Sequence, residues 1–209
     1  MSTIEFTKTP DSTSNMSVVR KLTVAAMLSA IAFVLMFLDT AVPLMPSFIK
    51  LDVSELPALI ASFAIGPVWG CAVCLVKNLI HLLMTQTGGI GEISNFILGV
   101  AFVLPAGLIY HHKKTKKNAI IGSLVGAVIM AAISYVSNLY VVYPIYYNFM
   151  PKETIIEAYK AIAPFANIKS IEQCLLYFNV PFTFVKGMIS AIITIFIYQP
   201  LRPLLKGNN

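Results

Sequence analysis

Six apolar stretches, separated by short polar or mixed segments, make up nearly all of this chain. They cover residues 18–39, 53–69, 70–87, 92–111, 118–139 and 176–200. A helix needs roughly 20 apolar residues to cross a hydrocarbon core about 30 Å thick. The pattern therefore predicts an all-α membrane protein with six transmembrane helices in a lipid bilayer.

The composition supports lipid as the solvent. Of the 209 residues, 57% are hydrophobic and only 11% are charged, whereas a soluble domain carries about 25% charged residues. This length accommodates one helical bundle and leaves no room for a separate catalytic domain. We expect residues 1–17 to form a flexible cytoplasmic tail and residues 18–209 to form a single transmembrane domain.

Basic residues gather at three places along the chain. They precede the first span (Arg20, Lys21), separate spans four and five (residues 111–117) and follow the last span (Arg202, Lys206). With six spans these places share one side, and the positive-inside rule makes that side the cytoplasm. Both termini are thus predicted to be cytoplasmic. The net charge of +6 is interpreted as a topology signal, with no nucleic acid as partner.

The connections on the opposite side are longer and more varied. They cover residues 39–55, 85–92 and about 140–175, whereas GPVWG (66–70) predicts a tight cytoplasmic turn. Within the third, one helical face predicts a short amphipathic helix on the outer surface, formed by Ile155, Ile156, Tyr159 and Ile162. A loop of about 35 residues on a small bundle is usually functional. The outer side is therefore predicted to recognise a ligand.

Polar side chains lie in the outer halves of the last three spans. Lys186 is about a third of the way into span six, and the others are Glu92, Asn95, Asn138 and Asn179. An ionisable group at bilayer depth costs roughly 2.5–3.5 kcal/mol on insertion scales, so it tends to mark a cavity, a partner or a pathway. Their shared depth predicts one polar-edged pocket that opens outward.

Each of these residues also has a purely structural interpretation. Asparagines often bridge membrane helices, Lys186 has the reach to snorkel to the outer interface, and Glu92 suits a helix N-terminus. Lys77 and His81, one turn apart in span three, receive no role from the sequence. Cys71 and Cys74 form a CxxC without a second ligand pair and are interpreted as buried free thiols.

Small residues recur at a spacing of four. Ala26 and Ala30 form one small-xxx-small pair in span one, Ala25 and Ser29 form a parallel pair, and GSLVG (122–126) repeats the pattern in span five. This spacing lets two helices approach closely in lipid. For span one, the pattern leaves open whether the neighbouring helix belongs to this chain or to a partner.

Several segments together resemble the substrate-binding S components of energy-coupling factor (ECF) transporters, and within these the riboflavin-specific members. They are the AMLSA helix (26–30), KLDVSELPALIASFAIGPVWG (50–70), GGIGEISNFILG (88–99) and NLYVVYPIYYNF (138–149). The resemblance extends from about residue 20 to 205. AxxxA alone is shared widely among S components, whereas the other three segments are more specific.

The resemblance implies a six-helix vitamin-binding protein of a prokaryotic plasma membrane. It implies association with a transmembrane coupling protein (the T component) and two ATPase subunits, toppling in the membrane to deliver the vitamin, and ATP binding only on those partners. Ala26 and Ala30 are thereby assigned to the face that contacts the coupling protein. Riboflavin contacts are implied in regions 40–52, 92–99, 134–146 and 178–187.

Flavin chemistry suggests individual contacts. A flat apolar ring with a uracil-like edge needs apolar walls and a few placed donors and acceptors. We assign Lys186 and Asn138 to the polar edge, and Glu92 and Asn95 to the ribityl hydroxyls. The predicted contacts are Leu44, Met45, Glu92, Asn95, Asn138, Tyr140, Asn179, Phe182 and Lys186. FMN is a second candidate ligand if its phosphate points outward.

Two alternatives remain at the level of sequence. The first is an S component for another vitamin, such as thiamine or biotin. The second is an intramembrane enzyme for a lipid or isoprenoid, which needs acids or histidines clustered at one depth. The sequence has neither HExxH nor a phosphate loop, so we predict that the chain is not an enzyme, with no catalytic cofactor and no metal.

Overall fold

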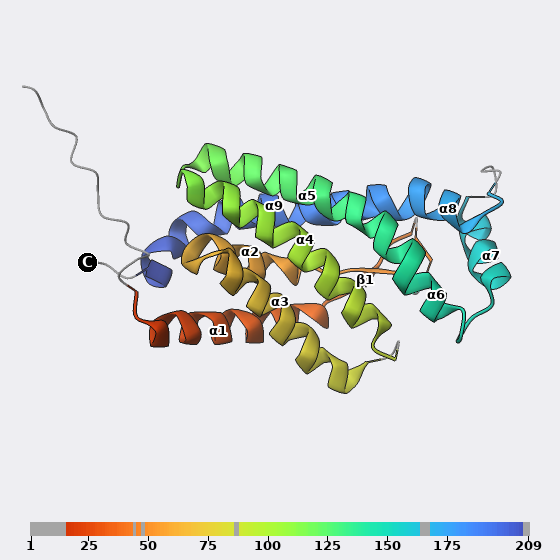
Figure 1. Cartoon of the computed structure of the whole chain (residues 1–209), viewed down its shortest axis with the longest axis horizontal. Helices are drawn as coiled ribbons and strands as arrows, with labels where there is room; N and C mark the ends of the chain where they lie inside the picture. Colours follow the sequence, from red (N-terminus) through yellow and green to blue (C-terminus); the bar gives the residue numbers. More distant parts are fainter. Residues whose placement is uncertain (1–15, 44, 47–48, 86–87, 164–167, 207–209) are drawn as a thin grey trace, which may run out of the picture.

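The computed structural model describes residues 16–43, 45–46, 49–85, 88–163 and 168–206. Within them, helices form a bundle with a small hairpin at one end (Figure 1). The longer helices are α1 (Val18–Met36), α2 (Glu55–Ile65), α3 (Pro67–His81), α4 (Ile90–His112), α5 (Lys116–Ser137), α7 (Lys152–Ile162) and α9 (Val180–Lys206). The predicted tail falls almost entirely outside the described residues.

Among the described residues, five helical stretches are long and apolar enough to cross a membrane. They span residues 18–36, 67–84, 90–112, 116–146 and 171–198. The second predicted span is the exception, because α2 has only 11 residues, all of them buried. At 1.5 Å per residue it is about 16 Å long. The all-α membrane class is confirmed, with a short central helix where the second full span was expected.

The connection between α2 and α3 is tighter than predicted. Only Gly66 lies between the two helices, with a φ of 122° that favours glycine. Pro67 is already the first residue of α3, where its missing N–H loses no helical hydrogen bond. The expected turn over residues 66–70 is therefore one residue long, and Val68, Trp69 and Gly70 belong to the helix.

The small residues of GSLVG bring α5 against α4, as their spacing predicts. A Cβ atom on Gly122 would lie 2.7 Å from the carbonyl oxygen of Ala106, and one on Gly126 would lie 2.5 Å from that of Phe102. Both distances are shorter than real Cβ contacts, so any larger residue would force the helices apart. This close packing occurs within the chain.

Two π-helical segments lengthen the last two spans at the same end of the bundle. α5 continues through η2 (Asn138–Val142) into α6 (Tyr143–Tyr146), and α8 (Ile171–Cys174) continues through η3 (Leu175–Asn179) into α9. In both, an N–H donates to the carbonyl five residues earlier. Such segments are rare and concentrate at functional sites. Hydropathy did not reveal them, because a π-helical turn has the same apolar composition as the α-helix on either side of it.

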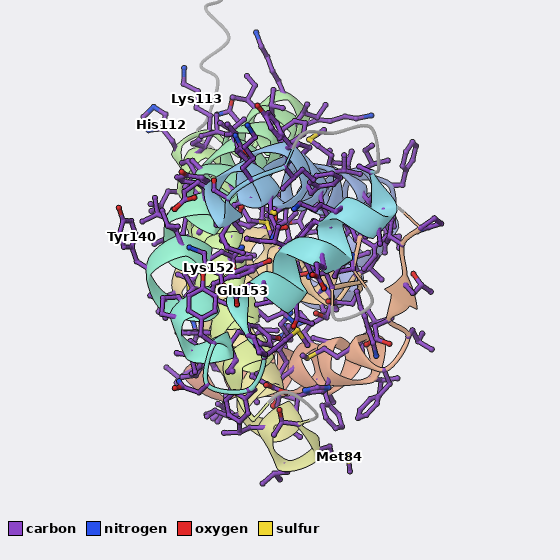
Figure 2. All side chains as sticks on the ribbon, turned by 90° about the vertical axis from the view of Figure 1, so that its right-hand side faces the viewer. Met84, His112, Lys113, Tyr140, Lys152 and Glu153 are labelled. Carbon is purple, nitrogen blue, oxygen red and sulfur yellow. The ribbon has the colours of Figure 1, made fainter. Side chains whose placement is uncertain are left out.

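The end that carries the π-helical segments also carries the most elaborate connections. A hairpin of β1 (Thr40–Ala41) and β2 (Lys50–Leu51) lies there, with Thr40 opposite Leu51. α7 lies across this end, away from the start of α1 and the α4–α5 connection (Figures 1 and 2). The predicted amphipathic stretch is a helix, and two of its apolar residues, Ile155 and Tyr159, are buried against protein.

Candidate ligand-binding site

A cavity of about 570 Å³ lies at the end of the bundle that carries the hairpin and the π-helical segments. The end of α1, the hairpin, the end of α3, the start of α4, η2, α6, η3 and α9 all contribute to its lining. Its volume falls in the range of pockets that enclose a small organic molecule. The cavity therefore brings together, at one end of the bundle, residues that are far apart in the sequence.

Six of the nine residues predicted from sequence line this cavity: Glu92, Asn95, Asn138, Asn179, Phe182 and Lys186. Met45 is buried but is not part of the lining. Tyr140 is 72% exposed and projects from the side of the bundle (Figure 2). Leu44 lies outside the described residues. The ligand contacts themselves stay predictions.

Lys186 contacts three polar side chains at the cavity. Its Nζ donates to Asp52 Oδ2 at 2.9 Å and to Asn95 Oδ1 at 3.1 Å, and it lies 3.4 Å from Glu55 Oε2. With only 6% of its surface exposed, the side chain does not snorkel. The 3.4 Å contact with Glu55 is longer than a strong charge-assisted hydrogen bond, so the ammonium group is held mainly by Asp52 and Asn95.

A second buried lysine, Lys77, contacts the same Glu55 carboxylate as Lys186. Lys77 Nζ is 3.2 Å from Glu55 Oε1 and donates to Ser54 Oγ at 2.5 Å, and both Lys77 and Glu55 are fully buried. Together with Asp52 and Lys186 they form a cluster of two carboxylates and two ammonium groups. Because a lone buried charge is very costly, this matched pairing makes the cluster tolerable inside the bundle.

Asp52 connects the hairpin to this charge cluster. It follows β2, and its Oδ1 accepts hydrogen bonds from the N–H and the hydroxyl of Ser54. Burial by itself would raise the pKa of Asp52, but the nearby ammonium groups of Lys186 and Lys77 and the bond from Ser54 hold it well below its usual range. Asp52 is therefore an anion that anchors both the hairpin and Lys186.

Glu92 belongs to a separate network on the other side of the cavity. Its Oε1 lies 2.7 Å from His81 Nδ1, and its Oε2 accepts from Thr85 Oγ1 at 3.0 Å. The N–H of Gly89 in turn donates to Thr85 Oγ1 at 3.0 Å. Glu92 lies in the first turn of α4. Its contact with His81 joins the start of α4 to the end of α3 and holds the imidazole ring beside the cavity.

A partly exposed ion pair lies in the lining of the cavity. Lys50 Nζ and Asp39 Oδ2 are 2.9 Å apart, each partly exposed, and both residues line the cavity. The pair ties the chain leaving α1 to β2 beside the hairpin. Exposed pairs of this kind contribute little stability.

Sequence reasoning did not single out several lining or supporting residues, although some of them fall in the regions implied by the resemblance. The most important are Asp39, Lys50, Asp52, Glu55, Lys77, His81, Tyr143, Tyr146 and Thr183. One signal was available: Asp52 and Glu55 flank the start of an apolar span, and Lys77 lies within another. Two acids and two lysines in apolar surroundings must pair, but the sequence did not indicate which acid faces which lysine.

The fold and the cavity define a class of protein: a membrane-embedded helical bundle with a binding site for a small molecule at one end. Residues 20–198 match the family described as ECF transporter, substrate-specific component. The chain belongs to this family, whose members are substrate-binding subunits of transporters and not enzymes. Within the described residues, no group of three or more His, Cys, Asp or Glu is placed to hold a metal ion.

Individual relatives are consistent with this assignment. The riboflavin transporter RibU of Staphylococcus aureus is 34% identical over 192 residues, which cover 92% of this chain and 95% of that protein. The riboflavin transporter FmnP of Bacillus subtilis is 30% identical, over 90% of this chain and 95% of its own. A solved S component of a bacterial ECF transporter aligns with a TM-score of 0.72 and 32% identity, over 91% of this chain and 99% of the other.

Proposed function

We propose that this chain is the riboflavin-binding subunit of an ECF-type vitamin transporter, which captures the vitamin outside and delivers it inward. One observation carries the proposal: a cavity of about 570 Å³ lies in a chain whose relatives over nine-tenths of its length are named riboflavin transporters. The polar residues predicted from sequence alone gather around the same cavity, which supports the proposal independently of the names.

The charge balance of the cavity suits a neutral ring. Asp52 and Glu55 are matched by Lys77 and Lys186, and Glu92 is a further carboxyl group, in contact with His81. A ligand carboxylate, as in biotin, would add an unmatched anion beside these acids, whereas the uracil-like edge of a flavin is neutral at pH 7. Moving a charged group out of water costs free energy that only a closely placed counter-charge offsets, so the site favours the neutral vitamin.

The proposed contacts follow from the geometry. Lys186 and Asn138 serve the polar edge of the ring, Asn95 and Glu92 serve the ribityl hydroxyls, and Phe182 supplies an apolar wall. Asn179 is a further donor, and Thr183 is added to the proposed contacts because it also lines the cavity. Tyr140 is not included, since its side chain faces away. FMN fits this proposal if its phosphate points outward beside Lys50.

The membrane arrangement is also a proposal. We infer six crossings, counting α2, with both termini and the basic α4–α5 connection in the cytoplasm of a prokaryote, and with α7 on the outer face. Support comes from Figure 1, in which the start of α1, the α4–α5 connection and the end of α9 share one end of the bundle. Residues 18–209 then form one substrate-binding domain within the plasma membrane.

The partners proposed for transport are the T component and two ATPase subunits, which alone bind ATP. Ala26 and Ala30 of α1 are exposed, whereas the parallel pair Ala25 and Ser29 is buried inside the bundle. The pattern of small residues thus leaves one pair free on the outside. That free pair supports docking of a partner helix at close range.

Calorimetry on flavin-stripped protein tests the ligand. We expect saturable heat with riboflavin at one molecule per chain, because the cavity has room for one flavin, and no saturable heat with thiamine or biotin. Protein purified from cells should also carry the absorbance bands of a flavin. No heat with riboflavin but saturable heat with thiamine would overturn the choice of vitamin while leaving the family unaffected.

A further inference from the structure

Three side chains form a hydrogen-bonded ring beside the cavity. The hydroxyl groups of Tyr143 and Tyr159 are 2.7 Å apart, Tyr159 donates to Asn179 Oδ1 at 2.5 Å, and Asn179 Nδ2 donates to the Tyr143 hydroxyl at 3.4 Å. They come from α6, α7 and η3, respectively. Tyr143 and Asn179 line the cavity, whereas Tyr159 lies behind them, fully buried.

With the Asn179 amide oriented as in the structure, counting protons fixes the direction of the bond between the two tyrosines. A carboxamide oxygen has no proton, so the single hydroxyl proton of Tyr159 must be the one given to Asn179 Oδ1. The bond between the two tyrosines then has Tyr143 as its donor. The 2.5 Å distance to Oδ1 fits O–H···O geometry and is too short for N–H···O, whereas the 3.4 Å bond from Nδ2 is a weak one. The amide orientation of Asn179 is therefore set by Tyr159.

This orientation leaves Asn179 with one N–H that is not used in the ring. Its Oδ1 faces Tyr159, so the amide presents its nitrogen on the side of Tyr143 and the cavity. A buried donor of this kind is costly unless a partner accepts from it. The cavity is where an acceptor can enter, and a ligand carbonyl oxygen has the required chemistry.

The local backbone is built to hold this arrangement. Asn179 is the last residue of η3, and Tyr143 directly follows η2. Tyr159 is brought to them by α7, whose Ile155 packs into the same buried cluster. Burial raises the pKa of Tyr159 far above its usual range, so its hydroxyl keeps its proton and remains a donor.

We propose that Tyr159 is a positioning residue for ligand recognition: it holds the Asn179 amide so that one N–H donates to a carbonyl oxygen of the bound ring. Tyr159 does not touch the ligand itself. The proposal rests on the proposed function, since it assigns the acceptor to the carbonyl-bearing edge of a flavin. It also assigns a role to α7, because the packing of that helix against the bundle places the Tyr159 hydroxyl beside Asn179.

Tyr159→Phe tests the proposal, because it keeps the ring in its packed position and removes only the hydroxyl. We expect riboflavin to bind about tenfold more weakly by calorimetry, the effect of losing one well-placed hydrogen bond. Tyr140→Phe is the matched control: Tyr140 is 72% exposed and does not line the cavity, so its affinity should equal that of the wild type.

A double-mutant cycle separates positioning from packing. If Tyr159 acts through Asn179, adding Tyr159→Phe to Asn179→Ala should cause no further loss of affinity. An equal loss in both backgrounds would overturn the proposal. So would unchanged affinity of Tyr159→Phe with a lower unfolding temperature, which would mean that the hydroxyl only stabilises α7. Riboflavin binding by the wild type is measured alongside, so failure of the vitamin assignment is recognised separately.

Discussion

Replacing Lys186 with methionine should weaken riboflavin binding about 10- to 150-fold, which corresponds to about 1.5–3 kcal/mol. The substitution keeps a long, flexible side chain and removes the charge. Lys186 lines the cavity and its Nζ holds Asp52 and Asn95 at 2.9 and 3.1 Å. We assign this ammonium group to a flavin carbonyl. Calorimetry with the purified variant measures the loss.

The same substitution also removes the counter-charge of two buried acids. Taking one partner from a buried ion pair typically destabilises a protein by about 3–5 kcal/mol, so a misfolded variant would imitate weak binding. Asp52→Asn combined with Lys186→Met removes both charges and restores neutrality around Glu55 and Lys77. If this folded double variant bound riboflavin as tightly as the wild type, Lys186 would be excluded from the ligand contacts.

Replacing both Ala26 and Ala30 with tryptophan should abolish riboflavin uptake in cells while leaving binding by the purified chain intact. Both alanines are exposed on α1, and tryptophan adds bulk where a partner helix must approach closely. Neither residue lines the cavity, which lies at the far end of the bundle. Uptake of labelled vitamin and pull-down of the coupling protein measure the two steps.

Met27 and Ile31 provide a matched control on the same helix. They have the same spacing of four and are 62% and 49% exposed, but each lies about 100° around the helix from its alanine neighbour. Tryptophan at both positions should leave uptake near the wild-type level. Normal uptake by the alanine-to-tryptophan variant would remove the proposed role of this face, and loss of vitamin binding would move the alanines into the site.

Local pattern was sufficient to locate most helices. The predicted starts and ends of the first, fourth and fifth apolar stretches lie within a few residues of those of α1, α4 and α5. The second stretch was predicted too long, because α2 is wrapped by its neighbours and ends at Gly66. Its apolar composition reflects burial in protein on all sides, which hydropathy does not distinguish from burial in lipid.

The sequence also revealed the depth of the polar residues but not their pairing. Glu92, Asn95 and Lys186 were correctly expected at one level of the bundle, because position within a span fixes height along the axis. Asp52 fell in an implied contact region but received no partner, although it binds Lys186 across 134 positions of the chain. Lys77 received no role and proved to be fully buried against Glu55.

By itself, the sequence determined the class of protein, most of its apolar helices and the end of the bundle where polar residues collect. These properties depend on hydropathy and spacing within one segment, and each can be evaluated residue by residue. Only the tertiary structure decided which acid pairs with which lysine, which pair of small residues faces outward, and that Tyr159 is hydrogen-bonded to Asn179. Those outcomes depend on the rotation of each helix about its axis and on the π-helical segments, and both are set by the packing of all segments together.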